Sequence, residues 1–188
     1  MNRQDRRAGP GGSTRARRGT QRARPKLRPT SALVRGALFN RLGSRVPGGK
    51  VLDLFAGTGS LGLEALRREA AEVIFVEHDA RLVAAIRARL ATEDLAERAE
   101  VWQRDAGVAV GELGSTRRRF DLIFMDPPYG GGWIPRMLHR IAETGTLAEG
   151  GIVVAEGHWR DRPDPAPGWN CTREARYGET VLWYFACE

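Results

Sequence analysis

The 188-residue sequence is poor in the residues that build disulfide frameworks and metal clusters: it has two cysteines, Cys171 and Cys187, and three histidines without metal-ligand spacing. We therefore expect no bound metal, and we interpret both cysteines as buried free thiols, which favours the cytoplasm. No apolar run approaches the ~20 residues of a membrane helix, and the N-terminus lacks the apolar core of a secretory signal. We expect a cytoplasmic monomer that contacts no membrane.

The first 26 residues lack aliphatic and aromatic side chains larger than alanine, apart from Met1. Such a segment cannot bury enough apolar surface to offset its ordering entropy, so we expect residues 1–27 to be a disordered Arg/Gly-rich tail before one domain at 28–188. Residues 1–28 carry ten basic groups and one acidic group, a net +9 that leaves −2 of the chain's formal +7 for the remainder. Nine of the ten are arginines, whose planar fork suits phosphate, so nucleic-acid contact is favoured over a purely solubilising role.

The remainder of the chain alternates apolar runs with amphipathic stretches. Strands are predicted at 51–55, 72–77, 99–104, 120–125, 151–156, 170–177 and 180–186, and helices at about 31–42, 61–70, 80–90, 107–113 and 134–143. The first helix has Thr30 or Ser31 as N-cap, and its Gly36 indicates close packing or a nearby ligand. Five strand–helix units followed by a hairpin predict an α/β, doubly wound, mostly parallel sheet with one antiparallel strand and helices on both faces.

A glycine loop, Gly57-Thr58-Gly59-Ser60-Leu61-Gly62, lies between the first strand and the second helix and fits G-x-G-x-x-G. With Glu77 at the end of the next strand, this pattern alone suits a dinucleotide-dependent oxidoreductase. Asp53 argues otherwise, because a carboxylate beside the loop repels a pyrophosphate but attracts S-adenosylmethionine, which carries an ammonium and a sulfonium. Glu77 would then bind the ribose hydroxyls and Asp105 the adenine amino group.

Each of these acids also has a purely structural interpretation: a loop cap for Asp53, a surface acid for Glu77 and a helix N-cap for Asp105. Acids at the ends of three successive strands favour the cofactor interpretation. The predicted cofactor site comprises Asp53, Phe55, Ala56, Gly57, Thr58, Gly59, Glu77, His78, Asp105 and Ala106.

Asp126-Pro127-Pro128-Tyr129 follows the apolar run 120–125 and forms a stiff segment at the carboxyl end of a predicted strand. An exocyclic amine on a nucleobase is a poor nucleophile, since its lone pair is delocalised into the ring. Asp126 and the Pro127 carbonyl can accept both amine hydrogens, and Tyr129 can stack on an extruded base. We predict Asp126, Pro127, Pro128 and Tyr129 as the catalytic segment. A mobile lip at 130–132 follows, and Trp133 is either a substrate contact or a core anchor.

In combination these motifs resemble the bacterial small-subunit ribosomal RNA guanine N2-methyltransferases, of the D type. The matching segments are 28–31, 38–40, 51–59, 75–77, 126–129 and 176–180. The resemblance implies a seven-stranded Rossmann-like class I methyltransferase fold, S-adenosylmethionine as donor with S-adenosylhomocysteine as product, and a guanine of 16S rRNA within an assembling small subunit as substrate. It also implies RNA contacts by Arg28, Thr30 and Asn40. The Arg/Gly tail, Ala32, Leu33 and Gly36 depart from the family pattern.

Three other functions fit parts of the pattern. The same catalytic segment serves adenine N6 or cytosine N4 methylation of RNA or DNA, because nothing local distinguishes the bases. A non-catalytic assembly or RNA-binding factor could keep this fold, although Asp53, Glu77 and Asp126 argue for turnover. A dehydrogenase would need a hydride-transfer constellation that the sequence does not contain.

Overall fold

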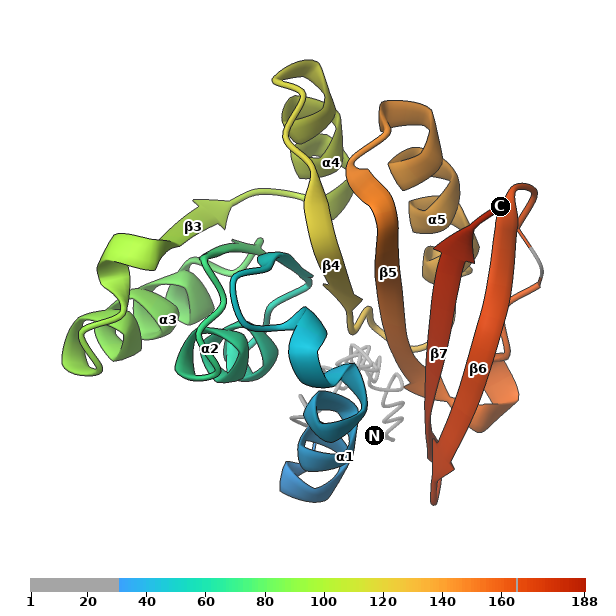
Figure 1. Cartoon of the computed structure of the whole chain (residues 1–188), viewed down its shortest axis with the longest axis horizontal. Coiled ribbons are helices and arrows are strands. Elements are labelled where there is room, and N and C mark those ends of the chain that lie inside the picture. Colours follow the sequence, from blue (N-terminus) through green and yellow to red (C-terminus); the bar gives the residue numbers. More distant parts are fainter. Residues whose placement is uncertain (1–30, 165) are drawn as a thin grey trace, which may run out of the picture.

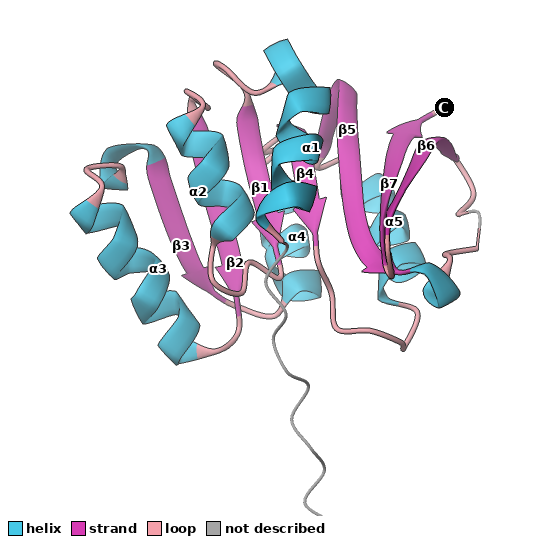
Figure 2. Ribbon diagram, turned by 90° about the horizontal axis from the view of Figure 1, so that it is seen from below, coloured by secondary structure: helices cyan, strands magenta, loops and turns pink. Residues whose placement is uncertain are grey.

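The computed structural model describes residues 31–164 and 166–188, so the predicted tail at 1–27 and the residues Arg28 and Thr30 lie outside the described part. The described part contains one seven-stranded sheet in the order β3-β2-β1-β4-β5-β7-β6 (Figure 1 and Figure 2). The strands are β1 Lys50–Leu54, β2 Glu72–Glu77, β3 Ala99–Gln103, β4 Phe120–Met125, β5 Leu147–His158, β6 Trp169–Tyr177 and β7 Thr180–Cys187. β7 runs antiparallel to both of its neighbours, whereas β1 to β5 are parallel. The predicted Rossmann-like class I methyltransferase fold is confirmed.

Helices cover both faces of the sheet (Figure 2). They are α1 Ala32–Leu42, α2 Ser60–Arg67, α3 Ala80–Thr92, α4 Ala106–Ser115 and α5 Trp133–Thr144, with short 3₁₀ turns at Gly43–Arg45, Ala96–Arg98 and Trp159–Asp161. One apolar core joins α1, α2 and α3 to the sheet, and a second joins α4 and α5 to the opposite face. None of the described helices is long and apolar enough to cross a membrane.

Local sequence signals explain where several helices begin. Ser31 is the N-cap of α1 and accepts a hydrogen bond from the Val34 N–H at 3.2 Å, while Asp79 caps α3 through the Arg81 N–H. Gly62, the third glycine of the loop motif, lies where α2 crosses β2. A Cβ atom there would meet the Phe75 ring at 2.2 Å, so only glycine allows this approach of helix to strand.

The structure corrects three expectations. β5 begins at Leu147 instead of residue 151, because its first residues pair with β4 through an irregularity between Phe120 and Leu122. Cys171 and Cys187 are free but exposed, since β6 is the edge strand and Cys187 ends β7. The close packing expected at Gly36 is also absent, because a Cβ atom there would have no neighbour within 4 Å among the described residues.

Candidate active site

Acidic side chains occur at the carboxyl ends of five adjacent strands. From β3 to β5, in the spatial order of the sheet, they are Asp105, Glu77, Asp53, Asp126 and Glu156. Parallel strands end at the same edge of a sheet, so the fold collects residues that are far apart in the sequence along this edge. The sequence predicted four of the five, and Glu156 is the addition.

Glu77 organises the loop that follows β1. Its Oε2 accepts the Gly57 N–H at 2.8 Å, and its Oε1 accepts the N–H groups of His78 and Asp79, both at 2.8 Å. The His78 Nδ1 lies 2.9 Å from the same Oε1, and the His78 ring is otherwise exposed. Glu77 is buried, which rules out its interpretation as a surface acid.

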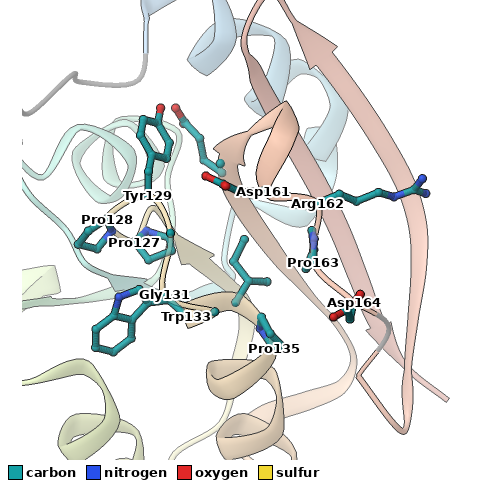
Figure 3. Close-up of a pocket in the computed structure, with 15 residues that line it drawn as sticks. Pro127, Pro128, Tyr129, Gly131, Trp133, Pro135, Asp161, Arg162, Pro163 and Asp164 are labelled. Carbon is teal, nitrogen blue, oxygen red and sulfur yellow. The ribbon is translucent and has the colours of Figure 1, made fainter.

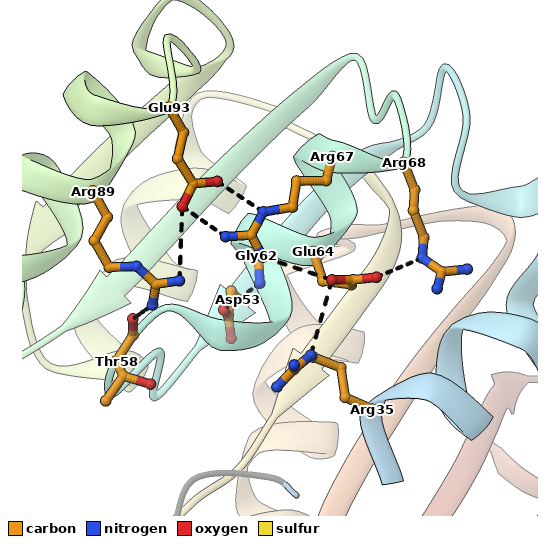
Figure 4. A network of polar contacts seen from close by, with 9 residues as sticks. All are labelled: Arg35, Asp53, Thr58, Gly62, Glu64, Arg67, Arg68, Arg89 and Glu93. Carbon is orange, nitrogen blue, oxygen red and sulfur yellow. Dashed lines mark hydrogen bonds and ion pairs between the residues drawn. The ribbon is translucent and has the colours of Figure 1, made fainter. Parts of the chain in front are cut away.

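Asp53 is buried beneath the glycine loop and accepts the Gly62 N–H at the start of α2, 2.9 Å from its Oδ2 (Figure 4). Burial raises the pKa of this carboxyl from 3.8 to about 7, the hydrogen bond from Gly62 opposes the shift, and Glu77 adds to it. No basic side chain forms an ion pair with Asp53 within the part of the chain that the structure describes. A desolvated carboxyl group in this state suits a cationic ligand.

A polar network surrounds this loop and fixes α2 against its neighbours (Figure 4). Glu64 on α2 contacts Arg35 of α1, Arg67 and Arg68, with the shortest separation, 2.8 Å, to the Arg68 Nε. Arg89 on α3 donates to the Thr58 carbonyl at 3.2 Å. These contacts connect α1 to α2 and α3 to the glycine loop.

The remaining predicted cofactor residues lie around the same edge. Phe55 leaves β1 with a φ of 61°, a conformation that is costly for a bulky side chain. The Ala56 N–H donates to the Val76 carbonyl at 2.9 Å, which holds the loop against β2. Asp105 is the N-cap of α4: its Oδ1 accepts the Gly107 and Val108 N–H groups at 2.9 and 3.2 Å. Asp105 therefore caps this helix through its Oδ1, and Ala106 is the first residue of that helix.

Asp126 lies between two other carboxyl groups. Burial, then the charge of Glu156, then that of Asp53 raise its pKa well above the usual range. No hydrogen bond reaches its carboxylate from the described residues. β4 and β5 are in register at Met125 and Ala155, so Asp126 and Glu156 occupy corresponding positions one residue further along.

The segment after Asp126 forms one wall of a cavity of about 230 Å³. Figure 3 shows Pro127 and Pro128 between the side chains of Tyr129 and Trp133, with Asp161 across from them. Residues 130–132 all have positive φ angles, 77°, 78° and 62°, which only glycine adopts readily. Trp133 lines the cavity and also packs edge-to-face on Phe55 with 5.5 Å between ring centroids, so it has an anchoring role within the protein.

A second cavity of about 250 Å³ lies between the first turn of α1 and the β6–β7 hairpin. Tyr129 and Glu156 line both cavities, while neither cavity reaches Asp53 or Glu77. Tyr129 is exposed and Glu156 is buried. The sequence analysis missed Glu156, and the one available signal was an acid at the end of the predicted strand 151–156.

Aromatic and arginine side chains continue from Tyr129 across the surface. The His158 ring lies 6.0 Å from Tyr129 and 5.8 Å from Trp159, measured between centroids. The exposed Trp159 ring lies 5.0 Å from the Arg160 guanidinium and 4.7 Å from that of Arg176. Stacked rings with arginines are typical of surfaces that bind single-stranded nucleic acid.

Of the three residues predicted to contact RNA, the structure describes one. Asn40 is exposed on α1, and Arg28 and Thr30 lie outside the described residues. Among the described residues no group of three His, Cys, Asp or Glu side chains is placed to hold a metal ion.

The topology and the strand-end site define a class I methyltransferase fold, and comparison with known proteins agrees. A solved Streptococcus pyogenes protein, described as a conserved hypothetical protein, matches with a TM-score of 0.74 at 32% identity, over 82% of this chain and 96% of that chain. The Thermus thermophilus RsmC structure, a 16S rRNA N2 methyltransferase in complex with AdoMet and guanosine, matches with a TM-score of 0.67 at 28% identity. It covers 88% of this chain and 44% of that chain.

The family of this chain follows from its sequence relatives. Ribosomal RNA small subunit methyltransferase D of Escherichia coli K12 is 32% identical over 172 residues, which cover 91% of this chain and 85% of that protein. The family model described as conserved hypothetical protein 95 matches residues 10–186. The chain belongs to this family, and the resemblance seen in its motifs is confirmed.

Proposed function

We propose that this protein transfers a methyl group from S-adenosylmethionine to the exocyclic N2 amine of a guanine in small-subunit ribosomal RNA. The observation that carries the proposal is the position of Asp126, which lies on the strand-end edge between the Asp53 loop and the cavity beside Tyr129. The RNA class is supported by the relatives named as small-subunit rRNA methyltransferases. The choice of guanine as the target base is supported by the Thermus thermophilus RsmC structure, whose complex contains guanosine.

The cofactor would be held by the first three acids of the row. Asp53 is a desolvated carboxyl group beside a glycine loop, which suits the ammonium of a methionine moiety and opposes a pyrophosphate. Glu77, fixed by three backbone N–H groups, would accept the ribose hydroxyls, and Asp105 would meet the adenine amino group. When bound, S-adenosylmethionine supplies an electrophilic methyl group.

The catalytic segment would prepare the amine for transfer. Asp126 and the Pro127 carbonyl accept the two N2 hydrogens, which draws the nitrogen lone pair out of the ring. The ionised Asp126 would take the proton that N2 loses as N2 bonds to the methyl carbon and the carbon–sulfur bond of the donor breaks, which leaves S-adenosylhomocysteine. The raised pKa of Asp126 makes its carboxylate the stronger base. Tyr129 stacks on the extruded base, and the stiff prolines keep these groups in place.

The flanking RNA would lie on the surface around Trp159. Its ring and the Arg160 and Arg176 guanidinium groups offer a stacking face and positive charge next to Tyr129. The N-terminal tail would add phosphate contacts as an electrostatic arm. We further propose that the protein acts as a monomer in the cytoplasm, on an assembling small subunit.

Incubation of the protein with labelled S-adenosylmethionine and undermethylated small ribosomal subunits tests the proposal. Nucleoside mass analysis should find N2-methylguanosine, and mapping should place it at one position of the 16S rRNA. Methyladenosine or methylcytidine would instead establish one of the alternative amine acceptors. Absence of any label, with cofactor binding intact, would favour a non-catalytic factor.

Deletion of residues 1–26 tests the tail separately. RNA affinity should fall and its dependence on salt should flatten, because fewer counterions are released on binding. Cofactor affinity should not change. An unchanged salt slope would leave the tail with only a solubilising role.

A further inference from the structure

Glu156 is a buried acid in a position that the cofactor does not explain. It ends the row of strand-end carboxylates on the side away from the glycine loop, and it lines both cavities next to Tyr129. A carboxylate that lines the cavities beside Tyr129 is placed to accept a hydrogen bond from a substrate, so the question is which donor the substrate presents there.

The register of the sheet places Glu156 beside Asp126. Asp53 pairs with Phe124 across β1 and β4, and Phe124 pairs with Val154 across β4 and β5. Side chains alternate between the faces of a strand, so Asp126 and Glu156, each two residues further on, belong to this same face. Leu182, the β7 partner of Glu156, packs in the core on that side. Two acceptor side chains thus lie next to each other where the base would enter.

The three candidate bases differ in the atom next to the reactive amine. Guanine has the N1–H donor beside its N2 amine, whereas adenine has the N1 lone pair beside N6 and cytosine has the N3 lone pair beside N4. In their ionised forms Asp126 and Glu156 only accept hydrogen bonds, so these two adjacent carboxylates match two adjacent donors. They oppose a base that presents a donor next to an acceptor.

We propose that the Glu156 carboxylate accepts the N1–H of the target guanine while Asp126 accepts from its N2 amine, which makes Glu156 the residue that selects guanine over adenine and cytosine. This assignment rests on the proposed function of the site. A carboxylate has two acceptor oxygens, so Glu156 can keep a contact within the protein and still accept from the base. Selection of this kind penalises the wrong base by leaving buried polar groups unpaired.

A thermodynamic cycle that combines one protein substitution with one base analogue tests the assignment. The substrate is small-subunit RNA ligated to carry either guanine or 2-aminopurine at the mapped position, since 2-aminopurine keeps the 2-amine but has a lone pair at N1. Affinity is measured with S-adenosylhomocysteine present, for the wild-type protein and for Glu156→Gln. The wild type should prefer guanine by about 10- to 100-fold, as expected for a hydrogen bond to a charged group. Glu156→Gln, which can donate to N1, should lose most of this preference.

A matched control and a separate readout keep the outcomes distinct. Glu149→Gln removes the same charge from the exposed start of the same strand and should keep the full preference for guanine. Glu156→Gln also changes the charge felt by Asp126, but that effect is common to both bases and cancels in the cycle. An equal preference for guanine in the wild type and Glu156→Gln would overturn the assignment, as would a wild-type preference for 2-aminopurine. Failure of the proposed function would appear earlier, as absence of N2-methylguanosine with the wild type.

Discussion

The two halves of the strand-end row differ in how their acids are held. On β1, β2 and β3 each acid accepts hydrogen bonds from the backbone: three N–H groups reach Glu77, two reach Asp105 and one reaches Asp53. On β4 no hydrogen bond from the described residues reaches the Asp126 carboxylate, whose pKa is raised by burial and by neighbouring charge.

This difference indicates two kinds of site. The first half is preorganised, because the backbone fixes each carboxylate before any ligand binds. The second half has a carboxyl group whose hydrogen-bonding capacity is still available to a substrate amine. The halves should therefore respond differently to substitution: changes in the first should alter cofactor affinity, and changes in the second should alter methyl transfer.

The largest expected effect comes from Asp126→Ala. It should reduce the rate of methyl transfer by about 10²- to 10⁴-fold, the usual range for the loss of a positioned proton acceptor. Cofactor affinity should stay within a few-fold, because Asp126 belongs to the substrate half. Single-turnover rates at saturating cofactor, together with calorimetric cofactor titration, measure both quantities. A variant with wild-type turnover would contradict the mechanism, and a large loss of cofactor affinity would break the distinction between the halves.

Glu77→Gln should have the opposite profile. The amide retains one acceptor oxygen, but its NH₂ group is a donor that faces backbone N–H donors, and these lose the carboxylate oxygen that accepted from them. Cofactor affinity should fall by about 10- to 100-fold, and the transfer rate at saturating cofactor should change much less. Glu97→Gln, on an exposed 3₁₀ turn, is the matched control and should bind cofactor normally. Equal affinity in both variants would exclude Glu77 from the cofactor site.

The pKa of Asp53 predicts how cofactor binding depends on pH. With a pKa of about 7, Asp53 is mostly protonated at pH 6 and mostly ionised at pH 8. If the ligand's ammonium binds the ionised form, affinity should be about tenfold weaker at pH 6 than on the plateau above pH 8. Asp53→Asn should bind weakly and lose this dependence. In the absence of cofactor, the pH dependence of stability has the opposite sign. The folded state binds the Asp53 proton more tightly than the unfolded state, so the contribution of Asp53 to the free energy of unfolding falls as pH rises from 3.8 towards 7.

The two halves also differ in how far the sequence predicted them. The glycine loop and the acids at 53, 77 and 105 follow from local signals, since turns and strand ends are visible in the residue pattern. The end of a predicted strand marks Glu156 as well, but its place beside Asp126 depends on the register of β5 against β4, which no local pattern contains. The Trp159 ring meets Arg176 only because the β6–β7 hairpin folds back on the Trp159 turn. The exposure of Cys171 depends likewise on β6 being the edge strand.

The smallest expected effects come from two glycines on neighbouring helices, and they have opposite signs. Gly62→Ala places a methyl group against the Phe75 ring and displaces the N–H that Asp53 accepts, so it should destabilise the fold by about 1–3 kcal/mol, the usual cost of overpacking. Gly36→Ala adds a methyl group in open space within a helix and should stabilise it by up to about 1 kcal/mol. Chemical denaturation measures both free energies of unfolding.

The two variants should also differ in their effect on ligand binding. Gly62→Ala should weaken cofactor binding, because it moves α2 away from Asp53. Gly36→Ala should leave cofactor binding unchanged, and its RNA affinity decides why α1 carries a glycine at that position. A loss of RNA affinity in a protein of higher stability would show that the RNA backbone approaches α1 closely at Gly36. Unchanged RNA affinity would leave this glycine without a role in the site, because no side chain in the described part of the protein packs against it.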